Sequence, residues 1–568
     1  IFIFFLMLVA TVVETLSIGV LVPLLSIILK GEVNLGFVSS WFNFQIPSGN
    51  NLIYAGLLSV ILVFVMKVIF LLYNHWHQSK FLETIWVELS DKLFKDYLRK
   101  DYLFFVKKNT SELIRNIRGE IPSFIEYLTK YILLLGETII SLGICGLLLF
   151  IDASTTIIIL SILALFTFLI HMFTTHKISS MGQERILHEG DYERHLAQGL
   201  TAAKDIKILN REENLIHQFL YRLKEISQIA LFVRFLGGVP KYTYELIIVA
   251  IFSVIIIYML SINRDIESII QYLAIFAVAS FRIIPGAARI FTAYQQIKFR
   301  QPTVDHMINE LSYEKENINK KIVKKDNDND EKINFEKSIN ISNVSFAYPI
   351  KRRNFSLSKI SLEIYKGQFI GIVGKTGSGK STFINILTGL LEPMSGKIES
   401  DGKNIFSNCV NWQKKIGYVP QTLYLTDDKI KNNIAFGLLE KDIDENSINK
   451  AIEKANLNEF IESLPDGINT IVGEKGIQIS GGQQQRIAIA RALYNDPEIL
   501  IMDEATSSLD IFTEKKIMDS IYNLKGKKTL IVITHRLSTI ENCDKIFFLE
   551  EGKIIKQGLP KEVLKKKY

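Results

Sequence analysis

The sequence Ile479-Ser480-Gly481-Gly482-Gln483 lies between a glycine-rich stretch, GKTGSGKS at 374–381, and an apolar run that ends in two acids, ILIMDE at 499–504. The glycine-rich stretch follows the apolar run FIGIV (369–373) and precedes TFINILTGLL. In this strand–loop–helix context, backbone N–H groups of the loop face a bound phosphate. The stretches together predict a phosphate-binding α/β domain built on buried parallel strands.

Composition divides the chain into an apolar first half and a last third of ordinary soluble character, so its 568 residues imply several domains. The formal charge of +7 does not indicate a nucleic-acid partner, because the basic residues lie mainly beside apolar stretches, as in membrane proteins. Cys145, Cys409 and Cys543 are far apart and lack metal-ligand spacing, so we expect neither a metal site nor a disulfide framework from them.

Six stretches of the first half are apolar enough, and long enough at about 20 residues, to cross a bilayer as helices. Two long connections, between the second and third and between the fourth and fifth stretches, are rich in Lys and Arg. The positive-inside rule places both in the cytoplasm, and their helical rhythm predicts that the spans continue beyond the membrane. The six stretches are 1–29, 52–73, 131–151, 155–174, 242–262 and 266–288.

Each long connection contains a point where the chain is expected to reverse. Asn109 has the position of a helix cap, with Glu112 three residues on as in a capping box, and the polar run AKDIKILNREEN (203–214) indicates the second reversal. In the short first connection, helical spacing predicts an apolar stripe outside the membrane, and an interfacial aromatic belt is the alternative. The stripe comprises Leu35, Val38, Trp41 and Phe42.

The segment NKKIVKKDNDNDEK (319–332) cannot bury enough apolar surface to order itself and predicts a linker. We therefore expect an all-α transmembrane domain at 1–314, a linker at 315–338 and an α/β domain at 339–568. The chain opens at Ile1 without a Met, so we expect residues to precede it, and its start does not have the pattern of a signal peptide.

Five side chains near the expected strand ends have the chemistry of nucleotide hydrolysis. Lys380 would neutralise the β- and γ-phosphates of ATP, and the Ser381 hydroxyl would ligate Mg²⁺. Asp503 would join the Mg²⁺ shell, and Glu504 would act as the general base on the attacking water. His535, after a third apolar run at 529–534, would hydrogen-bond the γ-phosphate and the base, although a histidine at a strand end is by itself more often structural.

The last domain resembles the nucleotide-binding domain of ABC transporters over its whole length, with Ile479 where that family usually has Leu. The resemblance implies an exporter-type half-transporter, in which an all-α six-helix transmembrane domain precedes a P-loop α/β ABC domain, with ATP and Mg²⁺ as cofactors. A head-to-tail homodimer would place the ISGGQ loop of one copy on the ATP of the other, giving two intact sites. We then expect a multi-pass protein of the inner or plasma membrane, with its ATPase domain in the cytoplasm.

The resemblance also implies the roles of individual residues. Tyr348 in FAYP matches the aromatic loop that stacks on adenine, and Gln421 in IGYVPQ matches the glutamine that senses Mg²⁺. Glu474 in VGEKG matches the exporter-type loop before ISGGQ, and SSLD (507–510) matches the family's D-loop, with Ser508 where Ala is usual. The expected nucleotide-binding set is Tyr348, Gly374, Lys375, Thr376, Gly377, Ser378, Gly379, Lys380, Ser381, Thr382 and Gln421. The expected metal ligands are Ser381, Gln421 and Asp503, the catalytic residues are Glu504 and His535, and the contacts to the partner's ATP are Ser480, Gly481, Gly482 and Gln483.

Four cations within or beside the apolar stretches are candidates for a substrate site, because charge inside a membrane span is costly. Arg282 and Arg289 lie about two turns apart on one helix face, on either side of a kink-prone Pro-Gly pair. Lys67 falls at a similar depth, and Lys241 begins the fifth span from the cytoplasmic side. Together they would receive a phosphate or pyrophosphate head group, and snorkelling toward lipid phosphates is the alternative.

Three stretches of the membrane half, SFRIIPGAARIFTAYQ (280–295), VETLSIGVLVPLL (13–25) and GGVPKYTYE (237–245), resemble the PglK-type lipid-linked oligosaccharide flippases. This resemblance implies ATP-driven movement of a polyprenyl-pyrophosphate saccharide among membrane lipids. Arg282 and Arg289 match arginines of that family, whereas Lys67 and Lys241 stand where it has arginine. The alternatives are a multidrug, peptide, phospholipid or lipid A exporter and, in another class, an ATP-gated regulator or channel, which an intact Glu504 and His535 disfavour.

Overall fold

The computed structural model describes residues 1–20, 50–261, 266–322, 332–349, 356–473, 479–505 and 511–564. The chain divides into two compact units. One contains Ile1–Lys100 and Phe104–Val323, and the other contains Asp101–Leu103 and Lys324–Tyr568. The predicted apolar stripe at 35–42, Glu474 and the 507–510 loop lie outside the described residues.

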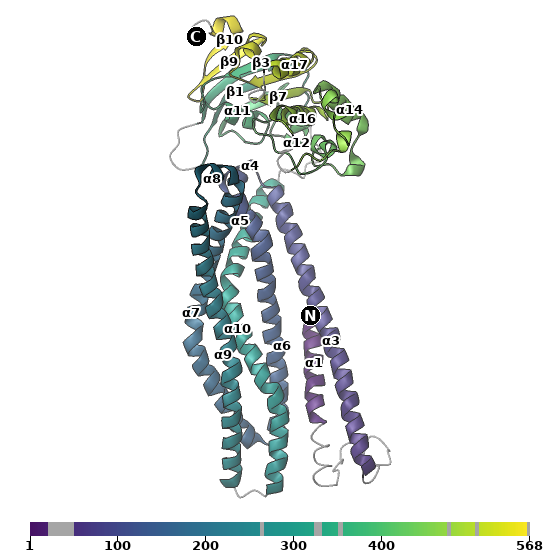
Figure 1. Cartoon of the computed structure of the whole chain (residues 1–568), viewed down its shortest axis with the longest axis vertical. Coiled ribbons are helices and arrows are strands. Elements are labelled where there is room, and N and C mark those ends of the chain that lie inside the picture. Colours follow the sequence, from purple (N-terminus) through teal and green to yellow (C-terminus); the bar gives the residue numbers. More distant parts are fainter. Residues whose placement is uncertain are drawn as a thin grey trace. The chain divides into compact units, whose positions relative to one another are not determined.

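The N-terminal unit is built from long helices that run side by side (Figure 1). Among the described residues, six of its helices are apolar and long enough to cross a membrane, which agrees with the six predicted spans. Helices α3, α7 and α9 continue far beyond their apolar parts, as the helical rhythm of the two long connections predicts, and α10 also extends far beyond its apolar part. The six helices are α1 (Phe2–Gly19), α3 (Asn50–Leu98), α6 (Ile121–Ile151), α7 (Ala153–Thr201), α9 (Glu212–Ser261) and α10 (Ile266–Ile322).

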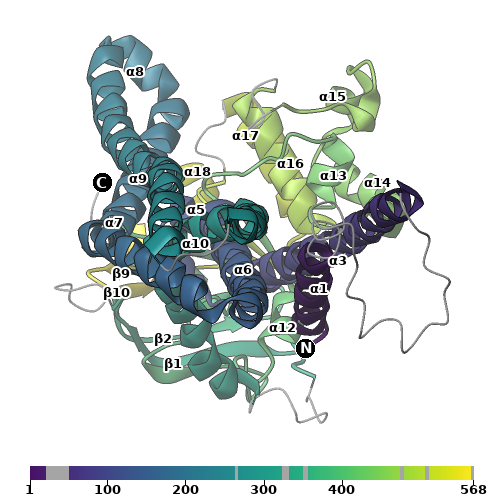
Figure 2. The same ribbon diagram turned by 90° about the horizontal axis from the view of Figure 1, so that it is seen from below.

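Helix α10 packs against α6, α7 and α9, and the end-on view shows these helices grouped together (Figure 2). Their shared core is aliphatic and aromatic, and includes the fully buried Ile144, Ile247 and Phe276. Helix α1 packs against α3 and α6. It approaches α6 closely at Gly143, where a Cβ would lie only 2.7 Å from the Thr11 Cγ2 atom.

Short helices form the two predicted reversals of the N-terminal unit. Asn109 caps α5 (Thr110–Arg115) by accepting from the Ser111 N–H at 3.0 Å, whereas the Glu112 carboxylate bonds the Lys108 ammonium and does not complete a capping box. Helix α4 (Tyr102–Lys107) precedes this cap. At the second reversal, α8 (Ala203–Leu209) ends at Asn210, whose φ of 49° gives the left-handed stop common after helices.

A π-helical turn, η1 (Asn116–Glu120), lies between α5 and α6. Such turns insert an extra residue into a helix and often occur at functional sites. Both ends of this one are buried, with Asn116 and Glu120 at 0% and 1% exposure. The Asn116 amide donates to the Tyr97 hydroxyl at 2.9 Å, so polar contacts hold the turn in the interior of its unit.

Helix α10 continues through Ile322, into the stretch expected as a linker, and the first strand begins at Ser338. Residues 315–322 contain no Gly or Pro, and half of them are Lys or Glu, which are good helix formers. Residues 323–331 lie outside the described ranges.

The C-terminal unit contains two sheets. The smaller is antiparallel, in the order β2-β1-β4-β5, from β1 (Ser338–Phe346), β2 (Leu357–Tyr365), β4 (Ser395–Ser400) and β5 (Lys403–Asn404). The larger has the order β10-β9-β3-β8-β7-β6, from β3 (Phe369–Val373), β6 (Ile416–Val419), β7 (Ile499–Asp503), β8 (Thr529–Ile533), β9 (Lys545–Glu550) and β10 (Lys553–Gly558). Only its β9–β10 pair is antiparallel among the described strands.

The central strands of the larger sheet are buried on both faces, as their continuous apolar runs predict. On β3, Phe369 faces one core cluster and Ile370 faces the other, and the same alternation occurs on β7 and β8. The helices of this unit include α11 (Lys380–Leu387), α12 (Cys409–Gln413), α13 (Ile430–Ile434), α14 (Glu445–Lys454), α15 (Asn458–Glu462), α16 (Gly481–Leu493), α17 (Ile511–Tyr522), α18 (Leu537–Glu541) and α19 (Pro560–Leu564).

Candidate functional site

Four neighbouring parallel strands deliver the predicted nucleotide residues to one edge of the larger sheet. Strands β3, β8, β7 and β6 are adjacent and parallel, so their carboxyl ends meet at the same edge. The glycine-rich loop follows β3 and His535 follows β8. Asp503 ends β7, and Gln421 lies just after β6. Ligands of open α/β sheets bind at this edge, so the topology itself brings the predicted residues together.

The glycine-rich loop is shaped by close backbone approaches. Gly377 and Gly379 have φ values of 82° and 104°, which favour glycine, and a Cβ on Gly379 would lie 2.6 Å from the Ser356 carbonyl oxygen. The Lys380 ammonium, on the first turn of α11, donates to the carbonyl oxygens of Gly374 and Lys375 at 2.8 and 3.0 Å. Burial lowers the pKa of Lys380. The loop therefore holds a desolvated cation that an anion would stabilise.

A glutamate at the end of β7 is held between two predicted partners. The Gln421 Nε2 atom donates to one Glu504 carboxylate oxygen at 2.7 Å, and the His535 Nε2 atom lies 3.1 Å from the other. Glu504 has a φ of 47°, a left-handed conformation that is uncommon for a residue with a side chain and is often found at functional sites. Gln421, Glu504 and His535 thus form one contiguous group, although they come from three separate parts of the sequence.

Asp503 lies next to this group and is buried, at 6% exposure. Burial raises the pKa of its carboxyl, and the neighbouring Glu504 carboxylate adds to the effect. Tyr418 on β6 makes a side-chain hydrogen bond with Asp503, and burial together with the Asp503 charge raises the pKa of Tyr418. Sequence reasoning missed Tyr418, although it lies within the IGYVPQ motif that identifies Gln421.

The ISGGQ loop opens helix α16. The Ser480 N–H donates to the Gln483 side chain at 2.8 Å, and the Gln483 N–H donates to the Ser480 hydroxyl at 3.3 Å, a complete capping box. Gly481 and Gly482 form the first turn between them. Within the described ranges, no hydrogen bond or ion pair joins Ser480–Gln483 to the glycine-rich loop.

The predicted adenine-stacking residue, Tyr348, follows β1. Its ring meets the Phe346 ring edge-on, with 5.1 Å between the two ring centroids.

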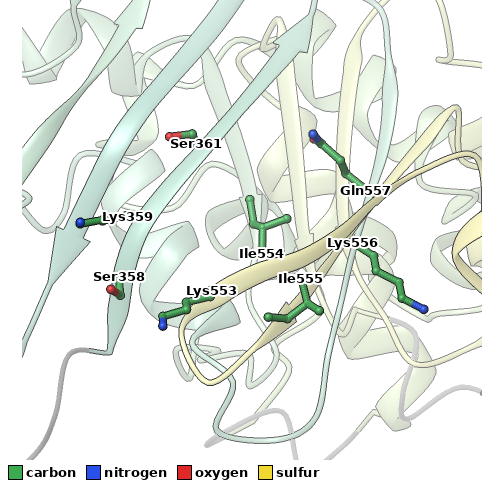
Figure 3. A pocket seen from close by; sticks show the side chains of 8 residues that line it. All are labelled: Ser358, Lys359, Ser361, Lys553, Ile554, Ile555, Lys556 and Gln557. Atoms are coloured by element: carbon green, nitrogen blue, oxygen red, sulfur yellow. The ribbon is translucent and has the colours of Figure 1, made fainter.

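A separate hollow of the C-terminal unit lies between β2 and β10 (Figure 3). No predicted site residue lines this hollow, so it is not the nucleotide site. Its lining consists of Ser358, Lys359, Ser361, Lys553, Ile554, Ile555, Lys556 and Gln557.

A second candidate site lies within the N-terminal unit, where three of the four predicted cations meet two buried glutamates. Glu14 on α1 forms an ion pair with the Lys67 ammonium at 2.7 Å and lies 3.3 Å from the Arg282 Nη2 atom. Glu137 on α6 binds the other side of Arg282 at 3.1 Å. It also binds the Nε and Nη2 atoms of Arg289 at 2.8 and 3.1 Å. The cluster links helices α1, α3, α6 and α10.

The predicted substrate-site cations differ from the sequence-based expectation in two ways. The four cations are predicted to receive a phosphate or pyrophosphate head group, and three of them are paired with carboxylates of the chain itself, because a buried charge is stable only with a partner. Lys241 is not joined to the cluster by any ion pair among the described residues, and its ammonium lies 5.6 Å from the centroid of the Tyr242 ring on α9. Glu137 was missed, although an acid within the apolar run 131–151 is itself a signal of function.

Two family models match the chain. Residues 1–284 match the model described as the ABC transporter transmembrane region, and residues 357–507 match the model described as ABC transporter. The first match covers half of the 568 residues.

Curated relatives align over about two fifths of the chain's length. The ATP-dependent lipid A-core flippase of Coxiella burnetii is 45% identical over 228 residues, which is 40% of this chain and 38% of that protein. The ABC transporter B family member 21 of Arabidopsis thaliana is 41% identical over 228 residues, which is 40% of this chain and 17% of that protein. The ABC multidrug transporter atrD of Emericella nidulans is 41% identical over 233 residues, 41% and 17% of the respective chains. The aligned part therefore spans well under half of each relative.

A solved structure of a bacterial Atm1-family ABC exporter with ATP bound superposes with a TM-score of 0.79 at 21% sequence identity. The superposition covers 99% of this chain and 95% of that one. At this identity the likeness concerns the fold alone. The two family matches confirm the predicted order of a membrane domain followed by an ABC domain.

Proposed function

The chain belongs to the ABC transporter family, and on that premise we propose that two copies form an ATP-driven exporter that moves an amphipathic, anionic lipid between membrane leaflets. Its most specific form is a flippase for polyprenyl-pyrophosphate-linked saccharides. Six candidate spans and the matched membrane region make the chain a multi-pass membrane protein. We place its ATPase unit in the cytoplasm, on the side where the basic connections lie.

The observation that supports hydrolysis is the position of Glu504 between Gln421 and His535. A carboxylate held at both oxygens is oriented to accept a proton from an attacking water, which is the task of a general base. Glu504 keeps 22% of its side chain exposed, so water reaches it. His535 would then stabilise the charge that develops on the phosphate.

The residues at this edge fit ATP and Mg²⁺. The buried Ser378 hydroxyl has no hydrogen-bond partner in the described residues, and the nearby Lys380 ammonium is desolvated, so both would be satisfied by phosphate oxygens. Ser381, Gln421 and Asp503 would hold Mg²⁺, an all-oxygen set of the kind this ion prefers. When bound, Mg²⁺ would neutralise charge on the phosphates.

A homodimer accounts for the ISGGQ loop. The capped N-terminus of α16 is an anion site, and we propose that it faces the ATP of the second copy. Two-fold symmetry then gives two complete sites. The exposed apolar surface of α3 is consistent with a partner helix or lipid, since none of the residues in its most apolar window is buried within the chain.

For the cargo, the supporting observation is the cluster of Lys67, Arg282 and Arg289 within the membrane helices. Guanidinium groups bind phosphates in a bidentate manner, so this cluster favours a phosphate or pyrophosphate head group. A lipid A or multidrug exporter is the second candidate, because curated relatives with these names match about two fifths of the chain.

The test is a panel assay on the full chain in liposomes. Polyprenyl-pyrophosphate lipids, anionic phospholipids, neutral phospholipids and hydrophobic drugs are compared for stimulation of ATP hydrolysis and for transfer between leaflets. We expect the pyrophosphate lipids to be transferred best, and Arg289→Ala to lower the number of lipids moved per ATP hydrolysed. Preferential transfer of neutral drugs would overturn the cargo assignment.

A further inference from the structure

The two arginines of the charged cluster differ in how firmly they are held. Arg282 lies between two carboxylates, Glu14 at 3.3 Å and Glu137 at 3.1 Å, and 20% of its side chain is exposed. Arg289 binds only Glu137 among the described carboxylates, and 40% of its side chain is exposed. Arg289 is therefore the arginine that a ligand reaches first. To bind it, the ligand must break the ion pair between Arg289 and Glu137.

The cluster carries an uneven charge. It joins three cations, Lys67, Arg282 and Arg289, to two buried carboxylates, so it retains one positive charge when all five groups are ionised. All five lie on helices with candidate spans. An excess charge among such helices is costly, and an entering anion would lower that cost.

The contact between Glu137 and α10 depends on a glycine. A Cβ on Gly286 would lie 3.3 Å from the Glu137 Oε2 atom and 3.3 Å from the Ser141 hydroxyl. Gly286 lies between Arg282 and Arg289 on the same face of α10, so the carboxylate occupies the space that its missing side chain leaves. A single carboxylate therefore contacts both guanidinium groups.

We propose that Glu137 is an internal competitor for the anionic group of the cargo, and that it occupies Arg289 until a lipid phosphate displaces it. The inference rests on the proposed function in taking the cargo to be anionic. Arg282, Glu14 and Lys67 would stay paired and position the site, whereas the Glu137–Arg289 pair would open. Glu137 would thereby set specificity, because neutral lipids cannot compete with a carboxylate for a guanidinium.

The experiment measures equilibrium binding to the purified full chain in detergent, without ATP. The probes are geranylgeranyl pyrophosphate, inorganic pyrophosphate and the neutral alcohol geranylgeraniol. We expect Glu137→Gln to bind geranylgeranyl pyrophosphate at least about fivefold more tightly than the wild-type chain, the lower range of typical coupling between sites. Binding of the neutral alcohol should not change. Inorganic pyrophosphate separates recognition of a free anion from recognition of a lipid head group.

Two further variants serve as controls. Glu14→Gln removes the other buried carboxylate, which does not touch Arg289, and should not tighten binding of the pyrophosphate probe. Glu137→Asp keeps the charge but shortens the side chain, and should fall between the wild-type chain and Glu137→Gln. Because aspartate retains a partner for Arg282, this variant also tests the proposal if Glu137→Gln fails to fold.

The outcomes separate this inference from the proposed function. Tighter binding by Glu137→Gln without any lipid transfer in liposomes would support the competitor and overturn the transport assignment. Transfer of pyrophosphate lipids with equal or weaker binding by Glu137→Gln would overturn the competitor alone. Absence of pyrophosphate binding in every variant, or equal tightening by Glu14→Gln, would also overturn it.

Discussion

The nucleotide site and the charged cluster of the membrane helices are each organised around a glutamate, but the partners of the two glutamates differ. Glu504 lies between an amide and an imidazole, at the accessible edge of a sheet. Glu137 lies between two guanidinium groups and is buried. An amide and an imidazole orient a carboxylate by hydrogen bonding, whereas guanidinium groups, which stay charged, neutralise it. The first arrangement suits catalysis, and the second suits recognition by exchange of ions.

The largest expected effect comes from removing the base. Glu504→Gln should lower ATP hydrolysis by about a hundredfold to ten-thousandfold, the usual contribution of general-base catalysis, as measured by phosphate release. Glu453→Gln, an exposed glutamate of α14, is the matched control. Equal rates of ATP hydrolysis in Glu504→Gln and Glu453→Gln would contradict the assignment of Glu504 as the general base.

The cluster is tested by removing its central cation. Arg282→Ala removes the cation that contacts both buried carboxylates and leaves Glu14 with Lys67 and Glu137 with Arg289. It should destabilise the chain by about 1.5–3 kcal/mol, the range for losing a hydrogen bond to a charged group. Thermal unfolding followed by tryptophan fluorescence measures the effect. Arg289→Ala should cost less, because Arg289 is more exposed and has one carboxylate partner. An equal cost for both would contradict the asymmetry between the arginines.

Helix packing around the cluster predicts a smaller effect. A Cβ on Gly143 would lie 2.7 Å from Thr11 and 2.9 Å from Thr15, so Gly143→Ala should push α1 away from α6. We expect a loss of about 1–3 kcal/mol, typical of overpacking. Gly146→Ala is the control, since its Cβ would meet nothing within 4 Å and alanine favours a helix. If the two variants unfold alike, close packing at Gly143 does not hold α1.

The smallest expected effect on stability comes from the ion pairs of Asp496, a mostly exposed carboxylate. Hydrogen bonds from Lys454 and Lys528 lower the pKa of Asp496 from 3.8 to about 2. Their contribution to stability is present above pH 3.8 and disappears as the pH falls through about 2. Asp496→Asn should cost less than about 1 kcal/mol at neutral pH, because the carboxylate is mostly exposed. Denaturant unfolding of the wild-type chain and of Asp496→Asn at neutral pH and near pH 2 tests this. A loss of stability in the variant that persists near pH 2 would contradict it.

The nucleotide site could be predicted from the sequence because its determinants are local. A buried parallel strand delivers whatever follows it to one edge of the sheet, so Lys380, Asp503 and His535 could be placed before their neighbours were known. The partners of Glu504 could not be derived this way, since Gln421 lies on a different strand connection. The role of Gln421 came from the family resemblance. Tyr418 was not predicted, because its contact with Asp503 depends on the pairing of β6 with β7.

The membrane cluster was only partly predictable. Apolar composition identifies a span but does not determine which face of one helix meets which face of another. Glu137 and Arg289 are far apart in the sequence, and their contact depends on how α6 and α10 pack around Gly286. Counting acids as well as cations within the spans would have shown that Lys67, Arg282 and Arg289 had candidate partners in Glu14 and Glu137.

The π-helical turn at Asn116–Glu120 determines the rotational phase of helix α6. In an α-helix each residue turns the chain by about 100°, so one inserted residue reorients everything after it by that angle. Glu137 lies downstream on the same helix, so its direction toward α10 depends on a residue count made several turns earlier. A deletion of one residue in the turn would leave the composition of α6 intact and still rotate Glu137 away from both arginines.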